Sequence, residues 1–243
     1  MRFHFTFELK NEVIDVNYRR RILSFLKNAI EKSDKQFYQE LYGNGSNTNK
    51  DFTMSVYFVP ETQYGKETIS VKSKRIIVNM STPDSPTGIQ LYNAMCGQKF
   101  IWYRLSEENS LRLVKIQNGK EKLITRDRAV FNTLSPIVIR DHNRETGRDW
   151  FYTFEDEPAV DILKRNLEAE LSGKFQRDIS YDIRQLKVEF IRMKKVIIKN
   201  YELKIPCSLG VFSMEGEQYL LQYLYQRGVG AKRSLCFGML DLI

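Results

Sequence analysis

The chain has 243 residues, of which 42% are hydrophobic and 12% aromatic, and it carries a formal net charge of +8. This composition is sufficient for one large or two small packed domains and excludes an intrinsically disordered chain. No apolar run approaches the roughly 18–20 residues that a transmembrane helix needs, and the N-terminus lacks the apolar stretch of a signal peptide. We therefore expect a cytoplasmic protein whose positive charge favours a polyanionic partner, nucleic acid or an acidic surface.

The cysteines and histidines do not indicate a metal site. Cys96, Cys207 and Cys236 are widely separated and form no CxxC pair, and the two histidines, His4 and His142, lie far apart in the sequence. This pattern argues against a disulfide framework, a zinc site or a His-rich metal centre. We predict that the cysteines are small buried apolar residues and that the protein uses no metal or other cofactor.

The first half of the chain predicts the element order of a ferredoxin-like domain. Residues 1–9 alternate between apolar and polar, as in a half-buried strand, and apolar residues recur at helical spacing over 17–33. The further expected elements are a loop at 42–50, strands from 52 and from 74, a helix at 85–96, and strands at 99–105, 110–116 and 122–125. Without the last hairpin, this order is βαββαβ.

The second half repeats this order without visible sequence similarity. Its expected elements are strands at 135–140 and 150–153, a helix from 156 to 171, strands at 186–198 and 201–214, a helix at 216–226 and a strand at 235–242. We predict an α+β fold of two tandem ferredoxin-like (βαββαβ) domains, residues 1–130 and 131–243, joined near residues 128–134.

A glycine-rich loop, residues 228–238 (GVGAKRSLCFG), lies between the last expected helix and the last strand. Two glycines around one apolar residue allow the backbone to approach another chain closely, and successive amides of such a loop can bind an anion. Basic and hydroxyl side chains then supply donors for phosphate oxygens. The alternative is a helix C-cap followed by a tight turn. The candidate RNA-binding residues of the loop are Gly228, Gly230, Lys232, Arg233 and Ser234.

The glycine-rich loop resembles the signature G-apolar-G, five residues, G-apolar-G, which closes the chain in the RAMP superfamily of CRISPR proteins. Cys236 stands in place of the third glycine of that signature. Residues 133–138 (TLSPIV) resemble the family's segment at the start of the second domain, and residues 18–20 and 52–55 match in order and spacing. The chain as a whole is similar to the CRISPR repeat-RNA-processing endoribonucleases of this superfamily.

The resemblance implies a metal-independent endoribonuclease that binds CRISPR repeat RNA and cleaves it to mature guide RNA. In that chemistry the 2′-hydroxyl attacks the scissile phosphate, which gives a 2′,3′-cyclic phosphate and a free 5′-hydroxyl. Family members commonly place a His in the loop after the first helix, with a Lys and often a Tyr nearby. Here Tyr42 stands at about the His position, Lys50 at the Lys position, and Lys27 at the position often held by Tyr.

The missing His changes the expected rate. A tyrosine with an ordinary pKa near 10 is a poor base at neutral pH, so cleavage is expected to be roughly 10²–10⁴-fold slower if proton transfer is lost. Flanking lysines that lower the tyrosine pKa or stabilise charge directly would offset this loss. His4, on the polar face of the first strand, is a weaker catalytic candidate, and His142 is expected in a solvated turn.

Other cations are less specific candidates for RNA contacts. Arg192 and Lys194 alternate onto one face of the strand at 186–198, and Arg19 and Arg20 lie in the first turns of the first helix. For each pair, a solvated charged face is the alternative. Two other functions remain open: a non-cleaving repeat-RNA-binding subunit of a CRISPR effector complex, and a ferredoxin-like nucleotide or anion binder outside this family.

Overall fold

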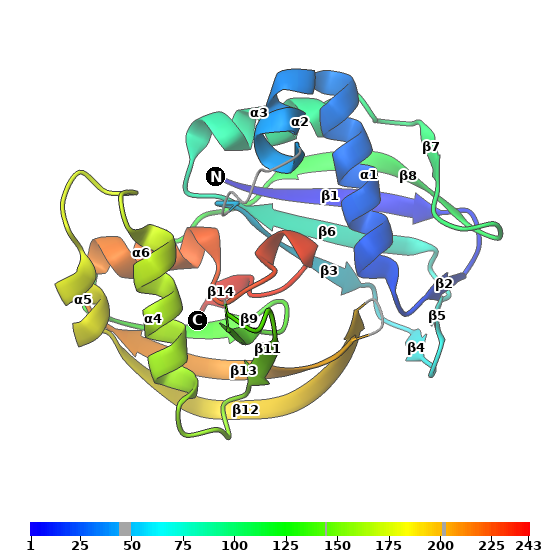
Figure 1. Ribbon diagram of the computed structural model, residues 1–243. Helices are drawn as coiled ribbons and strands as arrows, with labels where there is room; N and C mark the ends of the chain where they lie inside the picture. Colours follow the sequence, from blue (N-terminus) through cyan, green and yellow to red (C-terminus); the bar gives the residue numbers. More distant parts are fainter. Residues whose placement is uncertain (44–49, 144, 201–202) are drawn as a thin grey trace.

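The computed structural model describes residues 1–43, 50–143, 145–200 and 203–243, and it consists of two ferredoxin-like halves packed side by side (Figure 1). The first sheet has the strand order β3-β6-β1-β8-β7, which is the ferredoxin-like order with β7 added at one edge. The elements of this half are β1 (Arg2–Leu9), α1 (Tyr18–Ser33), β3 (Thr53–Phe58), β6 (Arg75–Ser81), α3 (Ser85–Cys96), β7 (Trp102–Arg104) and β8 (Ser110–Asn118).

The apolar alternation of the first strand is confirmed. Phe3, Phe5 and Phe7 of β1 are at most 3% exposed, and Phe7 meets Phe25 of α1 edge to face at 5.2 Å between ring centres. Helix α3 begins where predicted because the Asp84 side chain accepts a hydrogen bond from the Thr87 amide as its N-cap.

Two additions to this half were not predicted. Three short strands, β2 (Val13–Asp15), β4 (Thr62–Tyr64) and β5 (Thr68–Val71), form a separate sheet. A second helix, α2 (Lys35–Tyr42), follows α1 directly because Asp34 caps it by accepting from the Phe37 amide. Tyr42 therefore ends a helix and does not lie in a loop, and residues 44–49 of the expected loop lie outside the described residues.

The second sheet has the strand order β12-β13-β9-β14, again ferredoxin-like. Its half contains β9 (Arg128–Thr133), α4 (Ala159–Leu171), α5 (Ser180–Gln185), β12 (Lys187–Asn200), β13 (Leu203–Glu215), α6 (Gln218–Arg227), the 3-10 turn η1 (Arg233–Leu235) and β14 (Leu240–Leu242). The strand expected at 235–242 is thus shortened to three residues, and no strand forms at 122–125.

The predicted linker at 128–134 is wrong, because these residues form β9 in the middle of the second sheet. Ala129, Phe131 and Thr133 point into the core, and β9 pairs with both β13 and β14. The proposed boundary between residues 130 and 131 falls inside this strand, so the division between the halves precedes Arg128.

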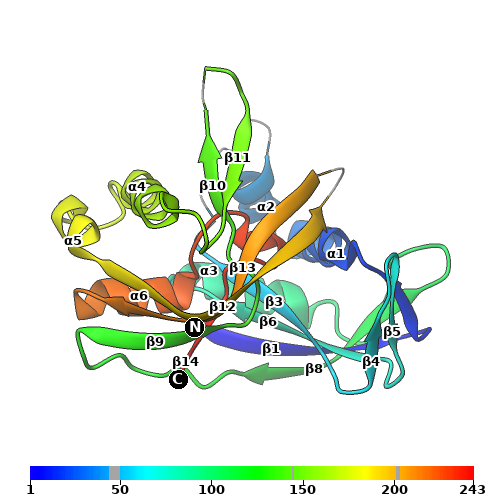
Figure 2. The same ribbon diagram turned by 90° about the horizontal axis from the view of Figure 1, so that it is seen from below.

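The two segments predicted as the first strands of the second domain pair with each other as a hairpin, but this hairpin is not part of the second sheet. β10 (Ile139–His142) and β11 (Asp149–Tyr152) pair only with each other and project from the body of the protein (Figure 2). Their apolar character reflects the base of the hairpin, where Ile139 and Tyr152 pack on the second core.

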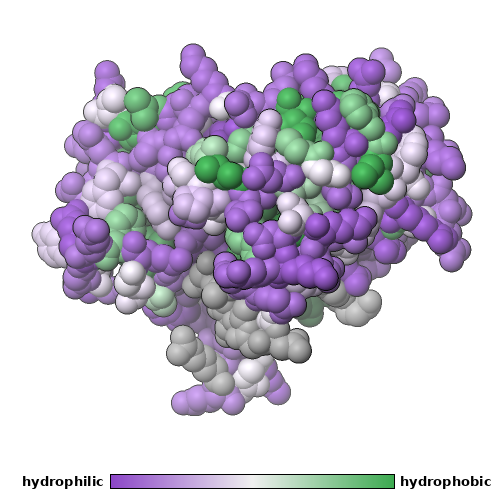
Figure 3. Space-filling model, turned by 90° about the horizontal axis from the view of Figure 1, so that it is seen from above, coloured by the Kyte–Doolittle hydropathy of each residue, from purple (hydrophilic) through white to green (hydrophobic). Residues whose placement is uncertain are grey.

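The surface and the cysteines complete the comparison with the sequence. Cys207 and Cys236 are buried as predicted, whereas Cys96 is exposed. On the face seen in Figure 3, the described hydrophobic side chains occur in small separate groups among hydrophilic ones. None of the helices in the described residues is long and apolar enough to cross a membrane.

Candidate active site

The glycine-rich loop connects the two halves of the protein. Thr53 Oγ1 of β3 donates to the Phe237 carbonyl at 2.9 Å, while the amides of Ala231 and Gly238 donate to the carbonyls of Val138 and Pro136 at 2.8 Å. The loop is therefore seated between β3 of the first half and the segment 136–138 of the second.

The glycines of the loop are required by this close packing. Gly228, Gly230 and Gly238 have φ values of +80°, +77° and +70°, and a Cβ atom on any of them would overlap a backbone carbonyl oxygen. Cys236 adopts the same left-handed backbone at φ +62°, so it replaces the third glycine without changing the local conformation. Both glycines therefore have a structural role: Gly228 is buried, and both pack against the protein backbone. Their contact with RNA stays a prediction.

The three predicted catalytic side chains lie together. The Lys27 and Lys50 ammonium groups are 4.5 and 4.8 Å from the centre of the Tyr42 ring. Each ammonium is attracted by the ring, which offsets part of the repulsion between the two charges. We call these residues the lysine–tyrosine cluster.

The electrostatics of the cluster exclude Tyr42 as a base at neutral pH. Burial and the neighbouring Tyr38 raise the pKa of the Tyr42 phenol well above its usual value, so the lysines do not lower it. The phenol oxygen is buried without a hydrogen-bond partner among the described residues. Burial and the charge of Lys27 lower the pKa of Lys50, which increases its neutral fraction at a given pH.

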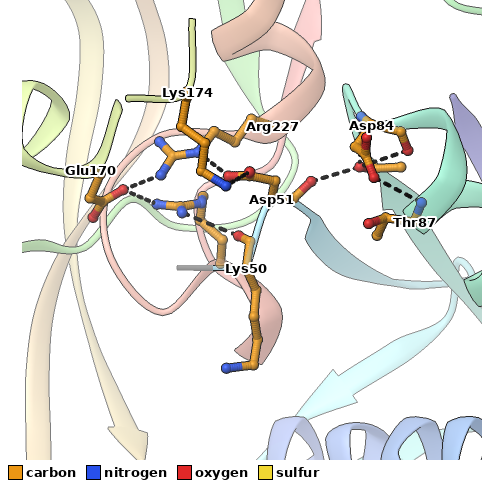
Figure 4. A network of polar contacts seen from close by, with 9 residues as sticks. Lys50, Asp51, Asp84, Thr87, Glu170, Lys174 and Arg227 are labelled. Carbon is orange, nitrogen blue, oxygen red and sulfur yellow. Dashed lines mark hydrogen bonds and ion pairs between the residues drawn. The ribbon is translucent and has the colours of Figure 1, made fainter. Parts of the chain in front are cut away.

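A buried set of ion pairs, the interface network, lies next to the cluster and joins the two halves (Figure 4). Asp51, which precedes β3, accepts from Arg227 at 3.1 Å, and Glu170 of α4 accepts from Arg227 and from Arg233 of the loop. Arg233 also donates to the Lys50 carbonyl at 3.3 Å. Figure 4 shows the Lys50 side chain extending away from the network, so the network holds the backbone and leaves the ammonium free to act.

The interface network corrects one predicted RNA contact. Arg233 is only 6% exposed, and its guanidinium is occupied by Glu170 and by the carbonyls of Gly230 and Lys50. It is therefore a structural residue and does not present its charge to RNA. Lys232 and Ser234 of the loop are half-buried, and burial together with the charge of Arg140 lowers the pKa of Lys232.

The remaining predicted cations lie at different distances from the loop. The Arg19 guanidinium packs on the Tyr18 ring at 4.7 Å and on the Phe237 ring at 5.2 Å, so it borders the glycine-rich loop. Arg20 is exposed one residue further along α1. Arg192 and Lys194 are exposed on β12 and share one face of that strand, as the alternation predicts.

Both histidines lie outside the lysine–tyrosine cluster. His4 is bound through Nδ1 to Asn79 on β6 at 2.6 Å, and His142 is bound to Asp149 on β11 at 2.7 Å. His142 ends strand β10 and does not lie in the turn itself. Neither histidine takes the place of the His that family members carry.

Three members of the interface network, Asp51, Glu170 and Arg227, were not predicted from the sequence. Arg227 is fully buried, and Asp51 also pairs with Lys174 at 2.7 Å. Lys50 and Asp51 line a cleft of about 460 Å³ that also includes Phe37 and Tyr223. In the sequence these residues are ordinary charges at element ends, and only their contacts across the interface distinguish them.

We predict that removal of one carboxylate of the network destabilises the protein. Glu170→Ala leaves two buried guanidinium groups without their shared acceptor, so unfolding free energy is expected to fall by about 3–5 kcal/mol. Glu168→Ala, two residues earlier, removes an exposed pair with Arg184 at 3.0 Å and is expected to cost less than about 1 kcal/mol. Urea unfolding of both variants measures the difference; equal small losses would contradict a buried network.

Comparison with known proteins agrees with this architecture. Residues 118–242 match the family model described as CRISPR associated protein Cas6, C-terminal. The chain is 32% identical to the Putative CRISPR-associated endoribonuclease-like protein Cas6nc of Pyrococcus horikoshii, but this match spans only 55% of the chain and 53% of that relative, about half of each. It is 25% identical to the CRISPR-associated endoribonuclease Cas6 1 of Methanocaldococcus jannaschii over 93% of this chain and 86% of that one.

Solved structures extend the similarity to the whole fold. A structure described as an RAMP protein binding different RNA substrates is 23% identical, with a TM-score of 0.86 over 100% of this chain and 99% of that one. A Cas6-related protein from Pyrococcus furiosus is 21% identical, with a TM-score of 0.84 over 100% and 98%. These likenesses support the tandem ferredoxin-like fold, and the match to the family model covers more than half of the chain. The chain therefore belongs to the Cas6 family of CRISPR-associated proteins.

Proposed function

We propose that the protein binds CRISPR repeat RNA in the cytoplasm and cleaves it without a metal ion at the lysine–tyrosine cluster. The observation that carries this proposal is the position of Lys50, whose backbone is held by Arg233 of the glycine-rich loop and whose ammonium lies over Tyr42 beside Lys27. Two cations in one half-buried site can stabilise the negative charge that develops on a phosphodiester during attack.

The substrate class follows from the relatives and from the charge. The full-length relative from Methanocaldococcus jannaschii is named an endoribonuclease, and one similar structure is described as a Cas6 product complex. A net charge of +8 favours binding of a polyanion. We infer that this chain takes the same class of substrate, a CRISPR repeat RNA.

The proposed reaction is an internal transesterification. Neutral Lys50 accepts the proton of the 2′-hydroxyl, whose oxygen forms a bond to the scissile phosphorus while the bond from phosphorus to the 5′-oxygen breaks. Charged Lys27 gives a proton to the leaving 5′-oxygen, so the products are a 2′,3′-cyclic phosphate and a 5′-hydroxyl. Solvent then restores both lysines to their initial protonation states.

Tyr42 has two roles in this scheme, and neither is that of a base. Its ring holds both ammonium groups close together. Its protonated hydroxyl is buried and lacks a partner among the described residues, so it would donate a hydrogen bond to a non-bridging phosphate oxygen once RNA binding exposes it.

A second candidate is a non-cleaving repeat-RNA-binding subunit of a CRISPR effector complex. It is favoured by the position of both histidines outside the cluster. It predicts tight binding of the repeat RNA with no product, even with enzyme in excess over RNA.

Removal of Lys50 tests the cleavage proposal. Lys50→Ala is expected to slow single-turnover cleavage of repeat RNA by about 100-fold or more, because it removes both a base and a charge. Lys35→Ala, an exposed lysine at the start of α2, serves as the matched control and should cleave like the wild type. In the wild type the rate should rise with pH as Lys50 becomes neutral, at a pH below the 10.5 of an ordinary lysine, and should fall again at higher pH because the scheme also needs a charged Lys27.

The direction in which the pH profile shifts also tests the proposal. Lys27→Ala removes the proposed acid, so it should slow cleavage; it also removes a neighbouring positive charge, so it should raise the pKa of Lys50 and move the rise of the residual rate to higher pH. A Lys50→Ala variant that cleaves as fast as the wild type would contradict the assignment of Lys50 as the base. Binding without any wild-type product would instead support the non-cleaving subunit.

Two substitutions separate the roles of Tyr42. Tyr42→Phe keeps the ring and loses one donor, so cleavage should slow by roughly tenfold. Tyr42→Ala removes the ring that both ammonium groups contact, and the loss should approach that of Lys50→Ala. Single-turnover rates at saturating enzyme measure both; complete loss of cleavage in Tyr42→Phe would show instead that the phenol is essential to proton transfer.

A further inference from the structure

A cleft of about 480 Å³ lies between the β10–β11 hairpin, helix α4 and the glycine-rich loop. Its volume is within the range of small-ligand sites, so it can accommodate part of a nucleotide. We call it the hairpin cleft. Its lining residues are Arg140, His142, Arg165, Asn166, Ala169, Glu170 and Ala231.

The acids at the hairpin cleft already have cationic partners. Burial alone would raise the pKa of Asp149, but hydrogen bonds from Arg140 and His142 outweigh it and hold this pKa below its usual range. An incoming anion therefore does not face an unpaired carboxylate. The pairs are Asp149 with Arg140 and His142, Asp141 with Arg165, and Glu170 with Arg227 and Arg233.

Two cations at or beside the cleft are not fully paired. Arg140 lines the cleft and its Nε atom has no partner, and Lys232, which follows the lining residue Ala231 in the loop, has no ion pair among the described residues. The charge of Arg140 contributes to the lowered pKa of Lys232, so the two cations lie within electrostatic reach of each other. A bound anion would relieve this repulsion.

We propose that the hairpin cleft is a second RNA-binding site, which holds a phosphodiester of the repeat RNA outside the cut site through Arg140, Arg165 and Lys232. This inference rests on the proposed RNA substrate, but it does not require cleavage. Glu170 lines the cleft and also belongs to the interface network, which holds Lys50 through Arg233. The two sites therefore border the same network, and one RNA strand bound to both would lie across the domain interface.

Binding measurements with the full chain test this proposal. The probe is a repeat RNA with a 2′-deoxy nucleotide at the cut position, together with versions shortened from either end. Arg165→Ala and Lys232→Ala should each weaken binding of the full RNA by roughly 3- to 10-fold. Log affinity falls as log salt concentration rises, and each variant should make this slope less steep by about 0.7. For one of the shortened RNAs, which lacks the bound segment, these losses should disappear.

A variant that binds RNA more tightly than the wild type provides a test that misfolding cannot mimic. Asp141→Asn removes the carboxylate that occupies Arg165 at 2.7 Å, so it should tighten binding by about two- to fivefold. Arg184→Ala removes an exposed arginine that pairs with Glu168 on the far part of α4 and should bind like the wild type. Adenosine monophosphate serves as a competitor, because a free nucleotide offers the same phosphate chemistry.

Three results would overturn the second site. Unchanged affinity in Arg165→Ala and Lys232→Ala, with tight wild-type binding, would remove the inference and leave the proposed function standing. Equal losses for every RNA length would place these residues at the cut site. Adenosine monophosphate could also displace RNA from the wild type at concentrations that do not change the RNA affinity of Arg165→Ala. That result would assign the cleft to a free nucleotide. Failure of the wild type to bind repeat RNA at all would instead overturn the proposed function.

Discussion

The buried ion pairs between Asp51, Glu170, Arg227 and Arg233 determine how the two halves of the protein fit together. Removing charges from water is costly, and such groups remain buried only where each finds a partner of opposite charge. Here the partners come from both halves: Asp51 precedes a strand of the first sheet, and the other three belong to the second half. Arg227 pairs with a carboxylate from each half, so loss of Asp51 or Glu170 leaves a buried guanidinium with fewer acceptors and weakens the interface.

This constraint explains how residues of the interface network position the candidate catalytic lysine. Lys50 is adjacent to Asp51, and its carbonyl is bound by Arg233, so its backbone is fixed at the interface through its own carbonyl and the following residue. The side chain then reaches Tyr42 and Lys27, where the aromatic ring moderates the repulsion of two ammonium groups. The glycine-rich loop thus acts mainly by packing and positioning, and its exposed chemistry is limited to the region of Lys232 and Ser234.

Sequence reasoning succeeded where the signal was local. The alternation of β1, the helix at 85–96 and the βαββαβ order of the first half all depend on neighbouring residues, and each is confirmed. It failed where a long-range contact decides the outcome. Strand β9 is short and is preceded by charged residues, so its burial between two other strands could not be recognised. The sequence of the loop likewise does not show whether Arg233 faces solvent or Glu170.

The most direct test of this account is a crystal structure of the protein with a repeat RNA that carries a 2′-deoxy nucleotide at the cut position. The account predicts that the scissile phosphate lies within hydrogen-bond distance of Lys50 Nζ and Tyr42 Oη, while Arg233 remains bound to Glu170. A scissile phosphate bound directly by Arg233, with Glu170 displaced, would contradict the positioning role of the interface network. So would a phosphate located away from Lys50.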